Sequence, residues 1–240
     1  MKLFRDILYN EEAPKEEYTM KKLPLRLLLA FIICVGLAIL FGYLAAAIEN
    51  ESIEHFDLAV INFIQGMEMQ WLTPIIKVFT WIGSGYVVAP ITIIAFALLF
   101  FVYQYREQAF LLVAVVIGTV ILNGLLKLYF KRERPEIYRI LEETGFSFPS
   151  GHTMMAFSLY TIIAYILWRN VKTTLNRVLL ILFTTFMIVN ISAGRIYLGV
   201  HYPSDIVGGF IASALWVIIA IAVYRFYQNR RENKGNRESV

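Results

Sequence analysis

Six long apolar stretches without charge dominate this sequence and limit the folds that it can adopt. None contains Asp, Glu, Lys or Arg, and they lie at residues 27–48, 78–105, 108–126, 147–168, 178–194 and 206–224. A helix needs about 20 residues to cross the ~30 Å hydrocarbon core of a bilayer, and each stretch is close to that length or beyond it. The chain is 58% apolar and 17% charged, whereas soluble domains carry about 25% charged residues. The sequence therefore predicts an all-α, polytopic membrane protein.

We expect six membrane-spanning helices in a single domain over residues 25–226. An N-terminal tail (1–24) and a C-terminal tail (227–240) flank this domain, and Cys34, the one cysteine, lies inside the first span. The first apolar stretch ends in alanines like a signal peptide, but it is longer than the 7–15 apolar residues of such a segment, so we expect it to remain as a helix. The predicted spans are residues 25–48, 73–103, 107–130, 150–169, 176–195 and 203–226.

The basic residues indicate how the spans are oriented. Lys and Arg are concentrated in the two tails and in the connection between the fourth and fifth spans. Because cytoplasmic loops are enriched in Lys and Arg, we predict a cell-membrane protein with both termini in the cytoplasm. The loop at residues 49–72, on the opposite side, is acidic and has neither Lys nor Arg. Its apolar residues have helical spacing, which predicts an amphipathic helix lying on the membrane.

Several basic residues on the predicted outer side do not fit an orientation signal. Arg195 ends the fifth span, and five more lie between Lys127 and Arg139. Lys127 and Arg134, seven residues apart in KLYFKRERP, would share one face if the third helix continued through both. An Arg fork and a Lys point charge both suit phosphate oxygens. Basic residues at span ends commonly snorkel toward water, so this segment alone is a weak signal.

A second segment, Pro149-Ser150-Gly151-His152, opens the fourth span. Ser150 is a good N-cap, and the amides that follow it would be unpaired at a helix start. Such a helix start binds anions, and Gly151 allows the backbone to approach closely. A capped helix start alone would not require an ionisable His152 at a membrane interface.

The third segment runs from Arg195 to Asp205. Pro203 favours the first turn of a helix, so the sixth span should begin there. His201 then precedes that turn and Asp205 lies within it, close enough for the carboxylate to accept a hydrogen bond from the imidazole. This bond would fix the tautomer and leave the other ring nitrogen as a nucleophile, although a His–Asp pair can also simply cap a helix.

Together these segments resemble the type 2 phosphatidic acid phosphatase (PAP2) superfamily, whose signatures are K-x6-RP, PSGH and SR-x5-H-x3-D. The resemblance covers about residues 25–226 and implies the six-helix core of PAP2 phosphatases and haloperoxidases. The chain departs from the third signature at Gly194, where the family has serine. We therefore expect the hydroxyl contact of that serine to be missing or replaced by water.

The resemblance also implies a role for each matching residue. His201 would attack phosphorus and form a phosphohistidine, Asp205 would orient it, and His152 would protonate the leaving alkoxide and later activate water. Cations and helix amides can compensate the charge of a phosphoryl group, and no carboxylate cluster suggests catalytic Mg²⁺, so we expect neither metal nor cofactor. The implied phosphate ligands are Lys127, Arg134, Ser150, Gly151 and Arg195.

The expected substrate is a lipid phosphate at the outer membrane face. Among bacterial members the resemblance is to the phosphatidylglycerophosphatase B type, which implies conversion of phosphatidylglycerol phosphate to phosphatidylglycerol; undecaprenyl pyrophosphate and phosphatidic acid are alternatives. The net charge of +4 lies at span ends, so the predicted partners are the lipid and the bilayer, with no nucleic acid and no obligate protein partner. Two other functions are disfavoured. An anion transporter would carry ionisable residues at the mid-depth of its spans, whereas those of this chain cluster at one face. Vanadate-dependent haloperoxidases share the three signatures but are soluble, whereas this chain has six long apolar stretches.

Overall fold

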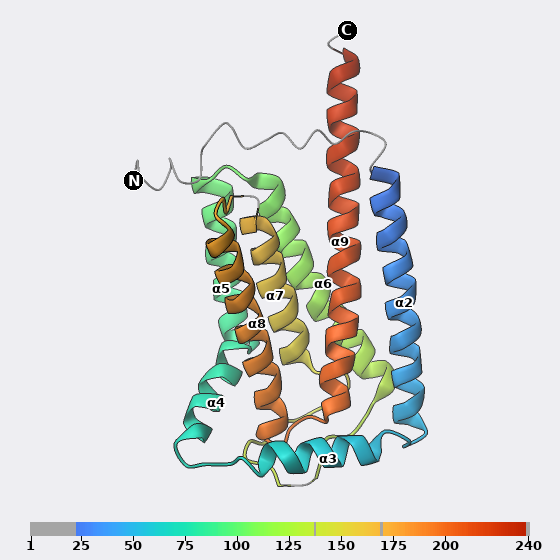
Figure 1. Ribbon diagram of the computed structural model, residues 1–240, viewed down its shortest axis with the longest axis vertical. Helices are drawn as coiled ribbons and strands as arrows, with labels where there is room; N and C mark the ends of the chain where they lie inside the picture. The colour runs from blue at the N-terminus through green and yellow to red at the C-terminus, as the bar shows by residue number, and fades with distance from the viewer. Residues whose placement is uncertain (1–22, 137, 169, 239–240) are drawn as a thin grey trace.

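The computed structural model describes residues 23–238 apart from 137 and 169, so nearly all of the predicted N-terminal tail lies outside the described residues. All regular secondary structure within them is helical, and six helices are long and apolar enough to cross a membrane, which confirms the predicted fold class. Figure 1 shows these helices side by side in one bundle. They are α2 (Leu23–Glu49), α5 (Gly85–Ala97) with the π-helical turn η1 (Leu98–Val102), α6 (Arg106–Phe130), α7 (Gly151–Trp168), α8 (Thr174–Tyr197) and α9 (Pro203–Glu238).

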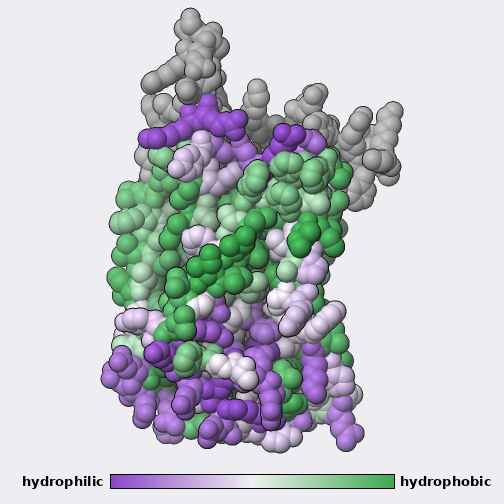
Figure 2. Space-filling view, turned by 180° about the vertical axis from the view of Figure 1, so that it is seen from behind, coloured by the Kyte–Doolittle hydropathy of each residue, from purple (hydrophilic) through white to green (hydrophobic). Residues whose placement is uncertain are grey.

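A broad band of hydrophobic side chains surrounds the bundle between two polar ends, as Figure 2 shows for one face. Large apolar residues on the outer faces of the helices are well exposed, among them Phe31, Ile39 and Phe101. Exposing such side chains to water would cost about 25 cal/mol for each Å² of apolar surface, so this band requires lipid around it. The protein is a multi-pass membrane protein.

The second predicted span, residues 73–103, is wrong as a single helix. The structure divides it into a short helix, α4 (Leu72–Ile82), and the spanning part, α5 with η1. The break lies at Gly83 and at Ser84, whose backbone is extended with ψ 156°. A Cβ at Gly83 would lie 2.4 Å from Cγ2 of Ile191, so glycine is needed for α8 to approach. A long run of uncharged residues predicts an apolar segment, but it does not show where a helix within that segment ends and the next one begins in a new direction.

The polar end that holds the three predicted motifs is covered by a helix lying across the bundle. This helix, α3 (Glu54–Gln65), lies within the loop predicted to be amphipathic, and Figure 1 shows it perpendicular to the spans. Ile61 of α3 packs against Ile196 and Ile206, at the ends of α8 and α9. The loop therefore contacts the helix ends that carry the motifs. At the opposite end, α9 continues through the predicted C-terminal tail to Glu238.

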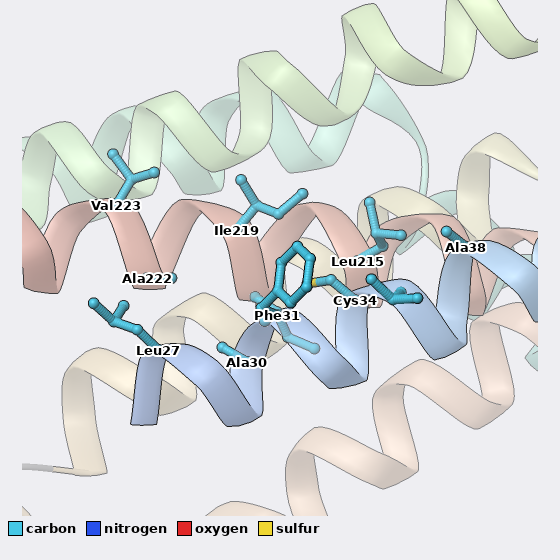
Figure 3. Close-up of a pocket in the computed structure, with 11 residues that line it drawn as sticks. Leu27, Ala30, Phe31, Cys34, Ala38, Leu215, Ile219, Ala222 and Val223 are labelled. Carbon is cyan, nitrogen blue, oxygen red and sulfur yellow. The ribbon is translucent and has the colours of Figure 1, made fainter. Parts of the chain in front are cut away.

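Helix α2 packs against α9 along the side of the bundle. Near the motif end, Leu44 of α2 contacts Phe148, just before the second motif, and Ile211 of α9. Farther along the same two helices, an apolar groove lies between them, in which Figure 3 shows Cys34 near Leu215. Helix α2 thus supports the backbone that leads into the second motif.

Candidate active site

The eight residues singled out in the sequence lie at one end of the bundle. Figure 1 shows the lower ends of α6, α7, α8 and α9 meeting above α3, with the connection of residues 131–150 between them. Polar side chains that are buried or half-buried are concentrated there. The eight residues are Lys127, Arg134, Ser150, Gly151, His152, Arg195, His201 and Asp205.

His201 is buried between a carboxylate and a guanidinium. Its Nδ1 lies 3.1 Å from Oδ2 of Asp205, and its Nε2 lies 3.3 Å from Nη1 of Arg134. A carboxylate only accepts hydrogen bonds and a guanidinium only donates them. The network therefore assigns the proton to Nδ1 and a lone pair to Nε2, the tautomer that a nucleophilic imidazole requires.

The protonation state of His201 follows from its surroundings. Burial lowers its pKa well below the ordinary value, and the nearby charges of Arg195, Arg134 and Lys127 lower the pKa further. The ring is consequently neutral near pH 7, with Nε2 free to attack. Pro203 begins α9 two residues later, as predicted, and the first turn brings Asp205 back to the imidazole, where Oδ2 also accepts the Tyr202 amide at 2.9 Å.

Arg134 reaches the site from an irregular segment, and not from a helix that continues from Lys127 through Arg134. Helix α6 ends at Phe130, and Lys131 adopts a left-handed conformation with φ 49°. Backbone carbonyls then fix the Arg134 guanidinium: Nε donates to Gly145 at 3.0 Å and Nη1 to Val200 at 2.8 Å. The buried side chain is therefore held in place beside His201 by the backbone around it.

Arg195 and Arg134 are bridged by a carboxylate that no motif indicated. Glu143, in the connection after α6, forms an ion pair with Arg195 and lies 3.2 Å from Nη2 of Arg134. Burial raises the pKa of Glu143, but the charges of Arg195, His152 and Arg134 outweigh it and lower the pKa overall. Arg195 is fully buried, and its Nε and Nη1 have no hydrogen-bond partner within the described residues. An anionic group thus already lies between the two predicted phosphate-binding arginines.

The start of α7 is held by hydrogen bonds from two neighbouring helices. The Ser150 amide donates to the Asp205 carbonyl at 3.1 Å, and the Asn123 side chain donates to the Pro149 carbonyl at 3.0 Å. A Cβ at Gly151 would lie 2.9 Å from Oδ1 of Asn123, so glycine is required for this approach. Amides 151–153 precede Met154, whose amide donates the first hydrogen bond of the helix, to the Ser150 carbonyl at 3.0 Å. They point out of the helix start, where an anion can bind.

His152 and Lys127 complete the cluster at its edge. Both are half-buried. A Cβ at Gly83 would lie 3.5 Å from Cδ2 of His152, which places that imidazole beside the break between α4 and α5. Lys127 lies near enough for its positive charge to be one of those that lower the pKa of His201, after burial and the charges of Arg195 and Arg134. Among the described residues, no group of three or more His, Cys, Asp or Glu side chains is arranged to bind a metal ion.

Gly194 lies against α4, at the position where the family signature has serine. The space around Gly194 determines whether a serine side chain would fit there. A Cβ there would lie 3.0 Å from Oγ1 of Thr80 and 3.1 Å from Cγ2 of Ile76, which requires a shift of a few tenths of an ångström. Oγ1 of Thr80 is buried without a hydrogen-bond partner in the described part of the chain, so it can bond to a new hydroxyl.

We expect Gly194→Ser to keep wild-type turnover within about threefold, because the new hydroxyl offsets the tight fit. Gly194→Ala is the control, since it introduces the same Cβ without the hydroxyl and should be the less active variant. Steady-state phosphate release from detergent-solubilised protein measures both. A large, equal loss in the two variants would show that the position needs glycine for space.

Comparison with known proteins gives consistent matches. The sequence pattern of the PAP2 superfamily matches residues 108–232. Phosphatidylglycerophosphatase B of Bacillus subtilis is 33% identical over 179 residues, covering 73% of this chain and 87% of the relative. The protein of the same name from Escherichia coli K12 is 37% identical over 83 residues, which cover 35% of this chain and 30% of the relative.

Two solved structures are also similar. The crystal structure of a transmembrane PAP2-type phosphatidylglycerolphosphate phosphatase from Bacillus subtilis superposes with a TM-score of 0.74 at 29% identity, covering 79% of this chain and 94% of the other. The structure of Aquifex aeolicus LpxE gives a TM-score of 0.52 at 28% identity, with coverage of 68% and 93%. Both similarities extend well beyond the short motifs.

Proposed function

Because the chain belongs to the PAP2 superfamily and is a lipid phosphatase, we propose that it hydrolyses phosphatidylglycerol phosphate to phosphatidylglycerol through a phosphohistidine on His201. The observation that carries this proposal is the buried neutral imidazole, with Nδ1 on Asp205 and Nε2 beside Arg134. A histidine held only for packing would not need a carboxylate on one ring nitrogen and, on the other, an arginine that can bind phosphate.

In the first step, Nε2 of His201 attacks phosphorus and the bond from phosphorus to the lipid oxygen breaks. The leaving alkoxide takes a proton from His152, and the charge that develops on the His201 ring is compensated by Asp205. His152 must be protonated at this stage. The negative phosphate that binds beside it favours that proton.

In the second step, a water attacks the phosphohistidine from the side that the lipid has left. His152, now neutral, accepts the proton of this water, the phosphorus–nitrogen bond breaks, and His201 returns to its neutral form. Inorganic phosphate is released and His152 is again protonated. His152 thus acts first as acid and then as base, and each step leaves it in the protonation state that the next step requires.

The phosphoryl oxygens would lie where the Glu143 carboxylate now bridges Arg134 and Arg195. We propose that phosphate displaces Glu143, and that the carboxylate in turn favours release of product phosphate. Lys127 and the amides at the start of α7 would complete the charge compensation on the equatorial oxygens.

Glu143→Gln should bind orthovanadate roughly tenfold more tightly than wild type, because no charged pair must then be broken, a change of ~1.4 kcal/mol. Inhibition of phosphate release by vanadate gives the affinity. Glu142→Gln, the exposed neighbour, is the matched control and should leave the inhibition constant unchanged. Equal or weaker vanadate inhibition in Glu143→Gln would show that the carboxylate supports anion binding and does not compete with it.

We propose that this chemistry needs no metal ion, because cations and helix amides surround the position of the phosphate. Turnover should therefore persist after dialysis against EDTA and remain constant when Mg²⁺ is added back, as measured by phosphate release. A loss on chelation that Mg²⁺ restores would contradict the proposal.

We place the site on the extracytoplasmic side, with both termini in the cytoplasm. The support is that the site and the acidic loop with α3 share one end of the bundle. Among the described residues, the basic end of α9 and the connection from α7 into the first turn of α8, with Lys172 and Arg177, lie at the other end, as expected for the cytoplasmic side. A single cysteine introduced at exposed Glu51, in a Cys34→Ser background, should react with a membrane-impermeant maleimide in intact cells. Reaction only after permeabilisation would reverse the orientation.

The substrate assignment is supported by the name and coverage of the Bacillus subtilis relative and of the solved structure. It is tested by phosphate release from phosphatidylglycerol phosphate, phosphatidic acid and undecaprenyl pyrophosphate in matched micelles. We expect the highest kcat/KM with phosphatidylglycerol phosphate. A tenfold preference for another lipid would replace the substrate, and the absence of release from all three would reject the function.

A further inference from the structure

Asp57 is a fully buried carboxylate on α3 that the proposed chemistry does not use. Its Oδ1 accepts the Ser204 amide at 2.8 Å, and its Oδ2 accepts the Ser204 hydroxyl at 2.5 Å. Oδ2 also lies 2.9 Å from Nη2 of Arg132. Burying a charge is costly unless it is paired and hydrogen-bonded, and both oxygens of Asp57 are satisfied by the start of α9 and by one arginine.

Arg132 extends this contact to the residue that orients the nucleophile. Its Nη1 donates to Oδ1 of Asp205 at 2.7 Å and to the Ser204 hydroxyl at 2.7 Å. Its guanidinium lies over the Tyr202 ring, 4.0 Å from the centroid. The planar fork therefore joins two carboxylates, one on each nitrogen, in a fixed plane.

Asp57, Arg132, Asp205 and His201 thus form one continuous chain of hydrogen bonds from α3 to the imidazole. The two oxygens of Asp205 are divided between neighbours, because Oδ1 accepts from Arg132 while Oδ2 accepts from His201 and Tyr202. Without Arg132, that carboxylate could rotate about its bond to the backbone. Without Asp57, Arg132 would lose the partner that fixes its second nitrogen.

Resting on the proposed function, we propose that Asp57 and Arg132 are positioning residues for the phosphohistidine step. They fix the carboxylate plane of Asp205 and hence the direction in which Nε2 of His201 points at phosphorus. In-line attack loses rate steeply with small misalignment, whereas binding of phosphate does not depend on that direction. Arg132 is also one of the basic residues on the predicted outer side, where the enrichment of Lys and Arg in cytoplasmic loops does not explain it. A positioning role would explain why a basic residue occurs at this position.

The prediction is a loss of kcat with little change in KM, because Lys127, Arg134 and Arg195 are untouched. Arg132→Gln should lower kcat by roughly 10²-fold and Asp57→Asn by roughly tenfold, with KM within about threefold of wild type. The double variant should be no slower than Arg132→Gln alone, because both act through one chain of contacts. Arg132→Lys should recover part of the rate, since it keeps the charge and one donor.

The controls are exposed charges on the same two segments. Glu54→Gln removes a carboxylate one turn before Asp57, and Lys131→Asn removes a cation next to Arg132 with a residue that tolerates φ 49°. Both should keep wild-type kcat. Rates are expressed per vanadate-binding site, so that only intact sites are counted in every variant.

Three results would overturn the proposal: a rise in KM that accounts for the loss, additive effects in the double variant, or loss of vanadate binding in all Asp57 and Arg132 variants. The last would mean that these residues are needed for the folded site as a whole. Acid-quenched phosphoenzyme in the wild type separates this proposal from the proposed function. Its absence there rejects the function, whereas its presence with normal rates in the variants rejects only the positioning role.

Discussion

Replacement of His201 by alanine should abolish turnover, with a loss of more than about 10⁴-fold in kcat. The ring is buried, neutral and oriented on both nitrogens, and no other imidazole in the part of the chain that the structure describes lies between Asp205 and Arg134. Water could replace it as the attacking group only by a different and slower reaction. Phosphate release from phosphatidylglycerol phosphate in micelles measures the loss, and acid-quenched samples with labelled phosphate should contain no phosphoenzyme.

Two further variants make this test specific. His55→Ala changes an exposed histidine of α3 and should retain wild-type activity. Asp205→Asn keeps the shape of the side chain but removes its charge, so it should lower kcat while leaving vanadate binding largely intact. A His201→Ala protein that still forms labelled phosphoenzyme would place the nucleophile elsewhere, with His152 as the next residue to examine.

The fold was predictable because the bilayer imposes a simple rule on composition. Uncharged stretches of sufficient length located the six spans, and Pro203 correctly marked the start of α9. The division of residues 73–103 at Gly83 and Ser84 was not predictable in the same way. It depends on the fit of α4 against Ile191, a contact between segments far apart in the sequence.

The site could be predicted only as far as local patterns reach. His152, His201, Asp205 and the basic residues occur in short segments with recognisable spacing, and the structure brings these segments to one end of the bundle. Glu143 and Asp57 belong to no such pattern. Each is one acidic residue among several in a loop or on a helix, and only the folded chain shows that one lies between two arginines and the other against α9.

Replacement of His152 by alanine should lower kcat for phosphatidylglycerol phosphate by on the order of 10²-fold or more. A lipid alkoxide is a poor leaving group, and the half-buried imidazole at the start of α7 is the group proposed to protonate it. p-Nitrophenyl phosphate needs no such help, because nitrophenolate leaves without a proton. The loss should therefore be much smaller with p-nitrophenyl phosphate, provided that formation of the phosphoenzyme limits the rate.

The comparison of the two substrates separates the loss of acid catalysis from damage to the site, because damage would slow both substrates alike. If formation of the phosphoenzyme is followed before the steady state, the burst of nitrophenolate release should keep nearly its wild-type rate in His152→Ala. Hydrolysis of the phosphoenzyme, the second step, should be slower than in the wild type because the base is missing. Vanadate binding counts the intact sites in both proteins. Equal losses on the two substrates in the burst phase would remove His152 from the acid role and leave it as a phosphate ligand, since a ligand serves both leaving groups alike.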